Sequence, residues 1–112
     1  MSKRNDKLLL LDILDSINKI FQYTKGYSFR DFSKDSKTID AVVRNFEIIG
    51  EAANHISKKL RKEHNIPWER IIGLRNVIIH EYFGVDLKII WKIVKQQLAD
   101  LKKQLEKILG SI

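Results

Sequence analysis

The sequence predicts an all-α fold, an antiparallel up-and-down four-helix bundle with room for one extra short helix. Apolar residues recur at spacings of three and four along four segments, which is the period of a helix packed on one side. The β-branched residues follow the same spacing, so strands have little support. A chain of 112 residues suits one domain with a modest core, and no repeat is visible. Residues 1–112 are therefore expected to form a single domain.

The first two helices are expected over about residues 5–23 and 38–62. The apolar face of the first is marked by Leu10, Leu14, Ile17 and Phe21. The intervening segment, residues 24–36, lacks helical periodicity and predicts a loop, with Asp35 or Ser36 placed to cap the next helix. The second helix has a broad apolar stripe, and its other face carries Arg44, Glu47, Glu51, Asn54 and Lys58.

The remaining two helices follow Pro67, the only proline, which suits the first turn of a helix because its missing N–H needs no partner there. Gly84 is placed to end the third helix in a left-handed cap. Asp86 then offers an N-cap to the fourth helix, whose apolar stripe consists of Trp91, Val94, Leu98, Leu101, Leu105 and Ile108. Short links between helices make an antiparallel bundle.

Composition excludes several classes of protein. Without cysteine, neither a disulfide framework nor a thiolate metal site is available. Asp12 and Asp15 interrupt the first apolar stretch, unlike a signal peptide, and no run reaches a membrane-spanning length. These features predict a soluble cytoplasmic protein without a membrane partner. The formal charge of +7 is consistent with an anionic partner such as nucleic acid, although lysine-rich helices are also ordinary solvated faces.

The segment Arg75-Asn76-Val77-Ile78-Ile79-His80-Glu81-Tyr82 combines groups suited to phosphodiester chemistry. Arginine can hold a phosphate in two-point contact, and histidine can move protons near neutral pH. On an ideal helix, however, Arg75 and His80 point roughly 140° apart and are offset by about 7.5 Å. To reach one phosphate, the arginine must wrap around, the helix must distort, or two subunits must contribute. A symmetric dimer satisfies the third requirement.

A purely structural interpretation is also open. Arg75 could pair with a carboxylate such as Glu51 on a neighbouring helix, while His80 bonds a helix-terminal carbonyl and Tyr82 packs at an edge. Glu47 and Glu51 share a helix face. They could form a solvated acidic patch, or they could be partners of Arg75 or His80.

Other candidate sites have less support. Two further histidines, His55 and His64, lack the spacing of a metal site, so no metal or other cofactor is expected. Trp68 and Trp91 fall on apolar stripes and are interpreted as core or interface anchors.

Several motifs resemble the HepT-like branch of the HEPN ribonucleases over roughly residues 5–110. They are Arg44-Asn45-Phe46-Glu47-Ile48-Ile49-Gly50-Glu51-Ala52, Ile66-Pro67-Trp68, Ile71-Ile72-Gly73-Leu74-Arg75-Asn76 and His80-Glu81-Tyr82-Phe83-Gly84-Val85-Asp86. Arg75, His80 and Tyr82 fit the R-x4-H-x-Y pattern of that family. Asn76 matches the asparagine that often follows its arginine.

The resemblance implies an all-helical homodimer with the motif at the subunit interface, acting as a metal-independent ribonuclease toxin. Arg75 and His80 would be catalytic, with Asn76 and Glu51 in support, and RNA would be cut to a 2′,3′-cyclic phosphate. The resemblance also implies a cognate antitoxin, a minimal nucleotidyltransferase of the MntA type. That enzyme would neutralise the toxin by transferring AMP from ATP onto Tyr82.

Two rival functions remain open on the sequence alone. HEPN domains also occur as non-catalytic partners of nucleotidyltransferases, in which case Tyr82 or a bound nucleotide would be presented to that enzyme. The other rival is a plain helical dimerisation bundle without enzymatic activity.

Overall fold

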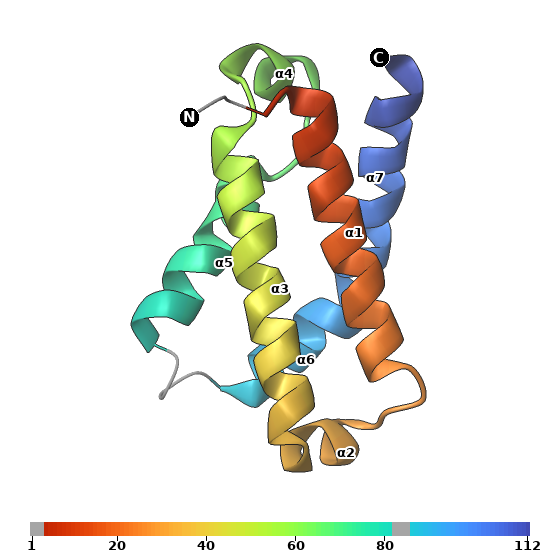
Figure 1. The fold of residues 1–112 in the computed structure, drawn as a ribbon, viewed down its shortest axis with the longest axis vertical. Coiled ribbons are helices and arrows are strands. Elements are labelled where there is room, and N and C mark those ends of the chain that lie inside the picture. The colour runs from red at the N-terminus through yellow and green to blue at the C-terminus, as the bar shows by residue number, and fades with distance from the viewer. Residues whose placement is uncertain (1–3, 82–85) are drawn as a thin grey trace.

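The computed structural model describes the backbone of residues 4–81 and 86–112 and the side chains of residues 4–75 and 86–112. In this part of the chain there are seven helices and no strand: α1 (Asp6–Thr24), α2 (Phe29–Lys34), α3 (Ser36–His55), α4 (Lys58–Glu63), α5 (Trp68–Glu81), α6 (Leu87–Gln96) and α7 (Leu98–Ser111). The long helices α1, α3 and α7 run alongside one another, and α5 lies on the other side of α3 (Figure 1). The predicted all-α bundle is confirmed, but its helix boundaries differ from the prediction in three places.

The first difference is α2, which lies in the segment predicted to be a loop. Ser28 and Asp31 form a capping box: Ser28 Oγ accepts from the Asp31 N–H at 3.1 Å, and Asp31 Oδ2 accepts from the Ser28 N–H at 3.0 Å. The buried Phe32 then anchors this short helix by stacking on Trp91, with ring centroids 5.0 Å apart. Capping and one buried aromatic side chain thus compensate for the missing periodicity.

The second difference is a break in the helix predicted over 38–62. Ile56 is extended, and Ser57 starts α4 by accepting from the Leu60 N–H at 3.2 Å. Ser57 also donates to Asp6 at the start of α1, from its N–H to Oδ1 at 2.9 Å and from its hydroxyl to Oδ2 at 2.5 Å. Asp6 thereby holds the chain at the point where α3 ends.

The carbonyls at the end of α3 are satisfied by Arg61 of α4. Its Nη2 donates to the Ala53 carbonyl at 3.1 Å and to the Asn54 carbonyl at 2.7 Å. A cation is favourable at this end of a helix because the dipole of α3 is negative there.

The third difference divides the predicted fourth helix at Gln97. Its N–H donates to the Ile93 carbonyl and its carbonyl accepts from the Leu101 N–H, so hydrogen bonding continues through the bend. The two halves contact different neighbours, since α6 packs on α2 and α7 packs along α1.

Two of the predicted helix starts are confirmed by side-chain caps. Asp35 Oδ1 accepts from the Thr38 N–H at 3.1 Å, and Asp86 Oδ1 accepts from the Lys88 N–H at 2.9 Å. Pro67 immediately precedes α5, and its carbonyl accepts the first backbone hydrogen bonds of that helix. The cap predicted at Gly84 lies outside the described residues.

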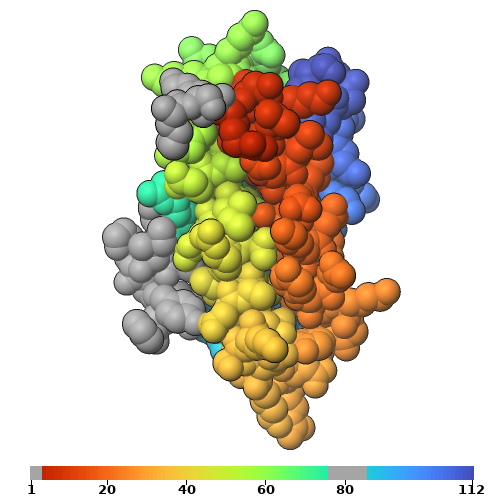
Figure 2. Space-filling model, in the orientation of Figure 1, coloured from red at the N-terminus to blue at the C-terminus, as the bar shows by residue number. Residues whose placement is uncertain are grey.

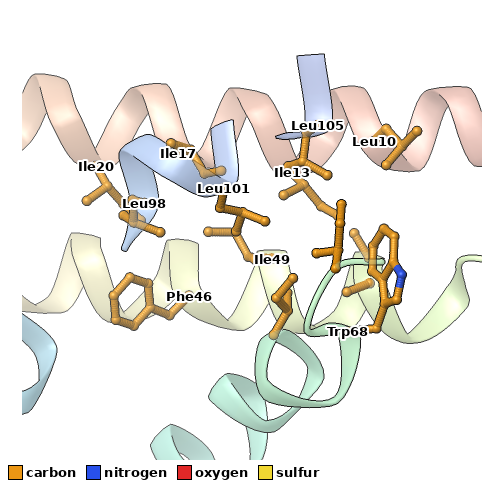
Figure 3. Packing of buried hydrophobic residues seen from close by; sticks show 14 of the residues in the cluster. Leu10, Ile13, Ile17, Ile20, Phe46, Ile49, Trp68, Leu98, Leu101 and Leu105 are labelled. Carbon is orange, nitrogen blue, oxygen red and sulfur yellow. The ribbon is translucent and has the colours of Figure 1, made fainter. Parts of the chain in front are cut away.

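The core fills the space between α1, α3 and α7 (Figure 3). Its completely buried side chains include Leu10, Ile13, Ile17, Ile20, Phe46, Ile49 and Leu105. Trp68 packs against this core at the start of α5, and its indole N–H donates to the His64 carbonyl at 3.1 Å. No helix in the described part of the chain is long and apolar enough to cross a membrane.

Candidate functional site

A groove with a volume of about 530 Å³ lies where α3 runs between α1 and α5. It is lined by Arg4, Leu9 and Asp12 from the α1 side, by Arg75 from α5, and by Arg44, Glu47, Ile48, Glu51, Ala52 and His55 from α3. The α3 residues recur at spacings of three and four, so they form one stripe along that helix. In the space-filling view, α3 is seen between α1 and the coloured part of α5 (Figure 2).

Arg75 reaches the wall of the groove because α5 crosses α3 at a glycine. A Cβ atom built on Gly50 would lie 2.6 Å from the Arg75 Cβ and 2.9 Å from the Arg75 backbone nitrogen. Contacts this short are not tolerated, so glycine is required for the two backbones to approach at this point. The Cα position of Arg75 is thereby fixed against α3.

The guanidinium of Arg75 is held by Glu51, which follows Gly50 in α3. Arg75 Nη1 donates to Glu51 Oε2 at 2.5 Å. The other carboxylate oxygen, Oε1, lies 3.0 Å from His55 Nε2, which is the donor because a carboxylate only accepts. Glu51 therefore connects an imidazole and a guanidinium, one through each oxygen.

The remaining charges of the groove form pairs of their own. Arg4 donates to both oxygens of Asp12, at 2.8 and 3.0 Å, and Arg44 lies 3.3 Å from Glu47. Three arginines and three carboxylates thus line the groove, and its charge is balanced. The exposed pairs Arg4–Asp12 and Arg44–Glu47 contribute only about 0–1 kcal/mol each, so an incoming anion can displace these two pairs.

The structure brings together two of the predicted site residues, Arg75 and Glu51. Asn76 and His80 belong to α5, which is one helix as far as Glu81, but their side chains lie outside the described residues. The predicted modification site, Tyr82, lies outside the described residues as well.

The ion pair between Arg75 and Glu51 is the contact that the structural interpretation of the sequence required. The ion pair is equally compatible with a phosphate-binding site. Glu51 is bonded to Nη1, and a guanidinium has five N–H donors, so other donors of Arg75 remain to bind a phosphate. The Arg75 side chain is 36% exposed, so solvent reaches it.

His55 is the member of this network that sequence reasoning missed. It was considered only as a metal ligand, whereas its i,i+4 spacing from Glu51 was the signal of their contact.

The two tryptophans lie where the sequence interpretation placed them, among packed side chains. Trp68 is buried and Trp91 is half-buried against Phe32 and Phe29, consistent with their interpretation as packing residues. Among the described side chains, no group of three or more His, Cys, Asp or Glu residues could hold a metal ion.

Comparison with known proteins identifies the family. The family model "Ribonuclease HepT-like" matches residues 13–108. The chain belongs to the HepT-like ribonuclease family. The α3 and α5 walls of the groove lie within the matched region.

Three relatives align over most of their length. A Methanocaldococcus jannaschii protein named "Putative RNase MJ1380" is 43% identical over 107 residues, which cover 95% of this chain and 98% of that protein. A Thermococcus cleftensis protein named "Probable ribonuclease HepT" is 42% identical over 107 residues, 95% of this chain and 97% of that protein. A Caldanaerobacter subterraneus protein named "Putative RNase TTE0752" is 43% identical over 98 residues, 87% and 88% respectively. No solved structure gives a significant match.

Proposed function

We propose that this HepT-like protein is a metal-independent RNA endonuclease in which Arg75 and His80 are catalytic. The observation that carries the proposal is the position of Arg75. Within a chain of this family, the arginine of an intact R-x4-H-x-Y motif reaches an open groove with its guanidinium exposed to solvent. The names of its relatives agree with a ribonuclease activity.

In the proposed reaction, the ribose 2′-hydroxyl attacks the adjacent phosphate and the bond to the 5′-oxygen of the next nucleotide breaks. His80 takes the proton of the attacking hydroxyl or supplies one to the leaving oxygen. Arg75 stabilises the negative charge that gathers on the phosphorane oxygens, and Asn76 orients His80 or bonds a nonbridging oxygen. The products are a 2′,3′-cyclic phosphate and a 5′-hydroxyl. DNA is not cut, because it lacks the nucleophile.

We further propose that the active form is a homodimer. On an ideal helix, Arg75 and His80 diverge by roughly 140°, so the arginine of one subunit would meet the histidine of the other more readily than its own. A two-fold axis near α5 places two copies of the motif face to face.

Control of the enzyme is assigned to Tyr82, as in a toxin with a cognate antitoxin. A minimal nucleotidyltransferase of the MntA type would transfer AMP from ATP to the tyrosine hydroxyl and release pyrophosphate. The added phosphate would compete with RNA for the cations of the site, and its bulk would block access.

The nuclease proposal is tested with His80→Ala, using a labelled oligoribonucleotide in the presence of EDTA. The wild-type protein should cut it, leaving 2′,3′-cyclic ends, whereas the variant should be inactive while folded and dimeric. The all-DNA oligonucleotide of the same sequence is the negative control. Undiminished cleavage by the His80 variant would falsify the assignment.

The control proposal is tested by intact-mass measurement of the protein made with and without the nucleotidyltransferase. The mass should rise in steps of AMP that map to Tyr82, with loss of RNA cleavage. If unmodified protein cuts no RNA but still accepts AMP, the non-catalytic partner function is correct instead.

A further inference from the structure

The connection from His55 through Glu51 to Arg75 extends the site beyond the motif. His55 and Glu51 lie one turn apart on α3, and both carboxylate oxygens of Glu51 are used, at 3.0 Å by His55 Nε2 and at 2.5 Å by Arg75 Nη1. An exposed glutamate side chain with a single partner rotates easily. A second hydrogen bond restricts that rotation, so His55 fixes the carboxylate that in turn fixes the guanidinium.

The backbone of this unit is restrained as well. Gly50 brings the Arg75 backbone against α3, and Glu51 is the very next residue. The backbone and Cβ of Arg75 at one end of its side chain, and Nη1 at the other end, are therefore both held by α3. This leaves the rest of the planar guanidinium group with a defined direction in the groove.

We propose that Glu51 and His55 are positioning residues of the ribonuclease, which orient Arg75 toward the scissile phosphate. This inference rests on the proposed function. Neither residue has to touch RNA: Glu51 acts on Arg75, and His55 acts on Glu51. Small errors of orientation at a charged catalytic group are costly, since misplacement by 1 Å can reduce a rate by about a hundredfold.

The charge of Glu51 gives this role a recognisable signature. A carboxylate beside the phosphate site repels the substrate in the ground state, so its removal tightens RNA binding. The same removal frees the guanidinium, so the chemical step slows. A residue that served only to keep the protein folded would not move binding and turnover in opposite directions.

The experiment compares Glu51→Ala, Glu51→Gln, His55→Ala and His55→Gln with the wild-type dimer. Single-turnover cleavage of a labelled oligoribonucleotide gives the rate, and a fully 2′-O-methylated oligonucleotide of the same sequence, which lacks the nucleophile, gives the Kd. Circular dichroism confirms that each variant is folded. Asp15→Ala is the control, because Asp15 is an exposed carboxylate of α1 that pairs with Lys19 and is not among the residues lining the groove.

We expect Glu51→Ala to slow cleavage by about ten- to a hundredfold while lowering the Kd. Glu51→Gln keeps an acceptor for Arg75 and should recover most of the rate. His55→Ala should slow cleavage less, and His55→Gln, which keeps a donor, should restore it. Because His55 acts through Glu51, the double alanine variant should be no slower than Glu51→Ala alone. Asp15→Ala should leave the rate and the Kd unchanged.

The inference is wrong if Glu51→Ala cuts RNA at the wild-type rate, or if the two alanine effects multiply. These outcomes differ from failure of the proposed function, which shows as wild-type protein that does not cut RNA or as a fully active His80→Ala variant. Absence of wild-type cleavage overturns both proposals.

Discussion

Helix α3 takes part in two very different contacts. On one side it packs with α1 and α7 through completely buried aliphatic and aromatic side chains, including Ile17, Phe46 and Leu105 (Figure 3). On the other side it crosses α5 at Gly50, beside the exposed pair of Glu51 and Arg75. The first contact is made by buried apolar side chains, whereas the second is marked by a close approach of the two backbones at Gly50.

The difference separates stability from function. Burying large apolar side chains supplies most of the favourable free energy of folding. The crossing with α5 has an exposed polar edge, where Gly50 fixes the position of the proposed catalytic arginine. Substitutions at the two contacts should therefore have distinct effects.

The largest expected effect is at the core. Ile17→Ala removes a completely buried side chain and leaves a cavity between helices, so the free energy of unfolding should fall by about 2–5 kcal/mol. Urea denaturation measures the loss. The rate of RNA cleavage per folded molecule should be retained. Lys19→Ala, at an exposed pair with Asp15 3.3 Å away, should change stability by less than about 0.5 kcal/mol. Equal losses of stability in the two variants would contradict the conclusion that the buried core supplies most of the stability.

At the crossing of α3 and α5, a substitution should reduce RNA cleavage strongly as well as stability. Gly50→Ala places a Cβ 2.6 Å from that of Arg75, so α5 must move away from α3. We expect a loss of about 1–3 kcal/mol in stability, together with a decrease of more than about tenfold in RNA cleavage. Denaturation and single-turnover assays on the folded variant measure the two quantities.

Gly73→Ala is the matched control on α5. A Cβ there meets nothing within 4 Å among the described residues, and replacing a helical glycine by alanine should stabilise the protein by about 0.5–1 kcal/mol. If Gly50→Ala were equally stabilising and fully active, close approach at Gly50 would not position Arg75.

The smallest effect concerns the corner between α2 and α3, away from both contacts. Hydrogen bonds from the Thr38 hydroxyl, the Tyr27 hydroxyl and the Thr38 backbone N–H lower the pKa of Asp35 from 3.8 to about 2. A lowered pKa in the folded state means that ionised Asp35 stabilises the protein above about pH 4. That contribution should be lost as the pH falls from about 4 to about 2.

Denaturation at pH values from 6 to 2 tests this prediction. Asp35→Asn should flatten the decrease in stability over the acid range, and Thr38→Val should reduce it by removing the strongest of these hydrogen bonds. An unchanged pH dependence in both variants would contradict the assigned cause.

The sequence was sufficient where structure depends on local periodicity. The apolar spacing predicted the long helices, and Asp35 and Asp86 were recognised as caps because an N-cap acts within three residues. The capping box of Ser28 and Asp31 was an available local signal that was overlooked, because α2 is too short to show periodicity. Ser57, the N-cap of α4, was a second local signal that was overlooked, whereas its hydrogen bonds to Asp6, 51 residues earlier, could not be inferred from a local pattern.

The candidate site was only partly predictable for the same reason. Arg75 could be selected by its chemistry, and Glu51 could be proposed as its partner from helix faces. The close approach at Gly50 depends on the angle at which two helices cross, which sequence spacing does not specify. The i,i+4 spacing signalled the contact between His55 and Glu51, but the fixed position of Arg75 to which this contact leads follows only from that crossing.

The hydrogen bonds between Asp6 and Ser57 have a consequence for the kinetics of folding. They join positions 51 residues apart, at the start of α1 and at the break after α3. Such contacts form only once both helices have docked, so they are expected to be absent from the folding transition state. Removing the Asp6 carboxylate should therefore accelerate unfolding and leave the rate of folding nearly unchanged. This contact would then lengthen the lifetime of the native state rather than guide its formation.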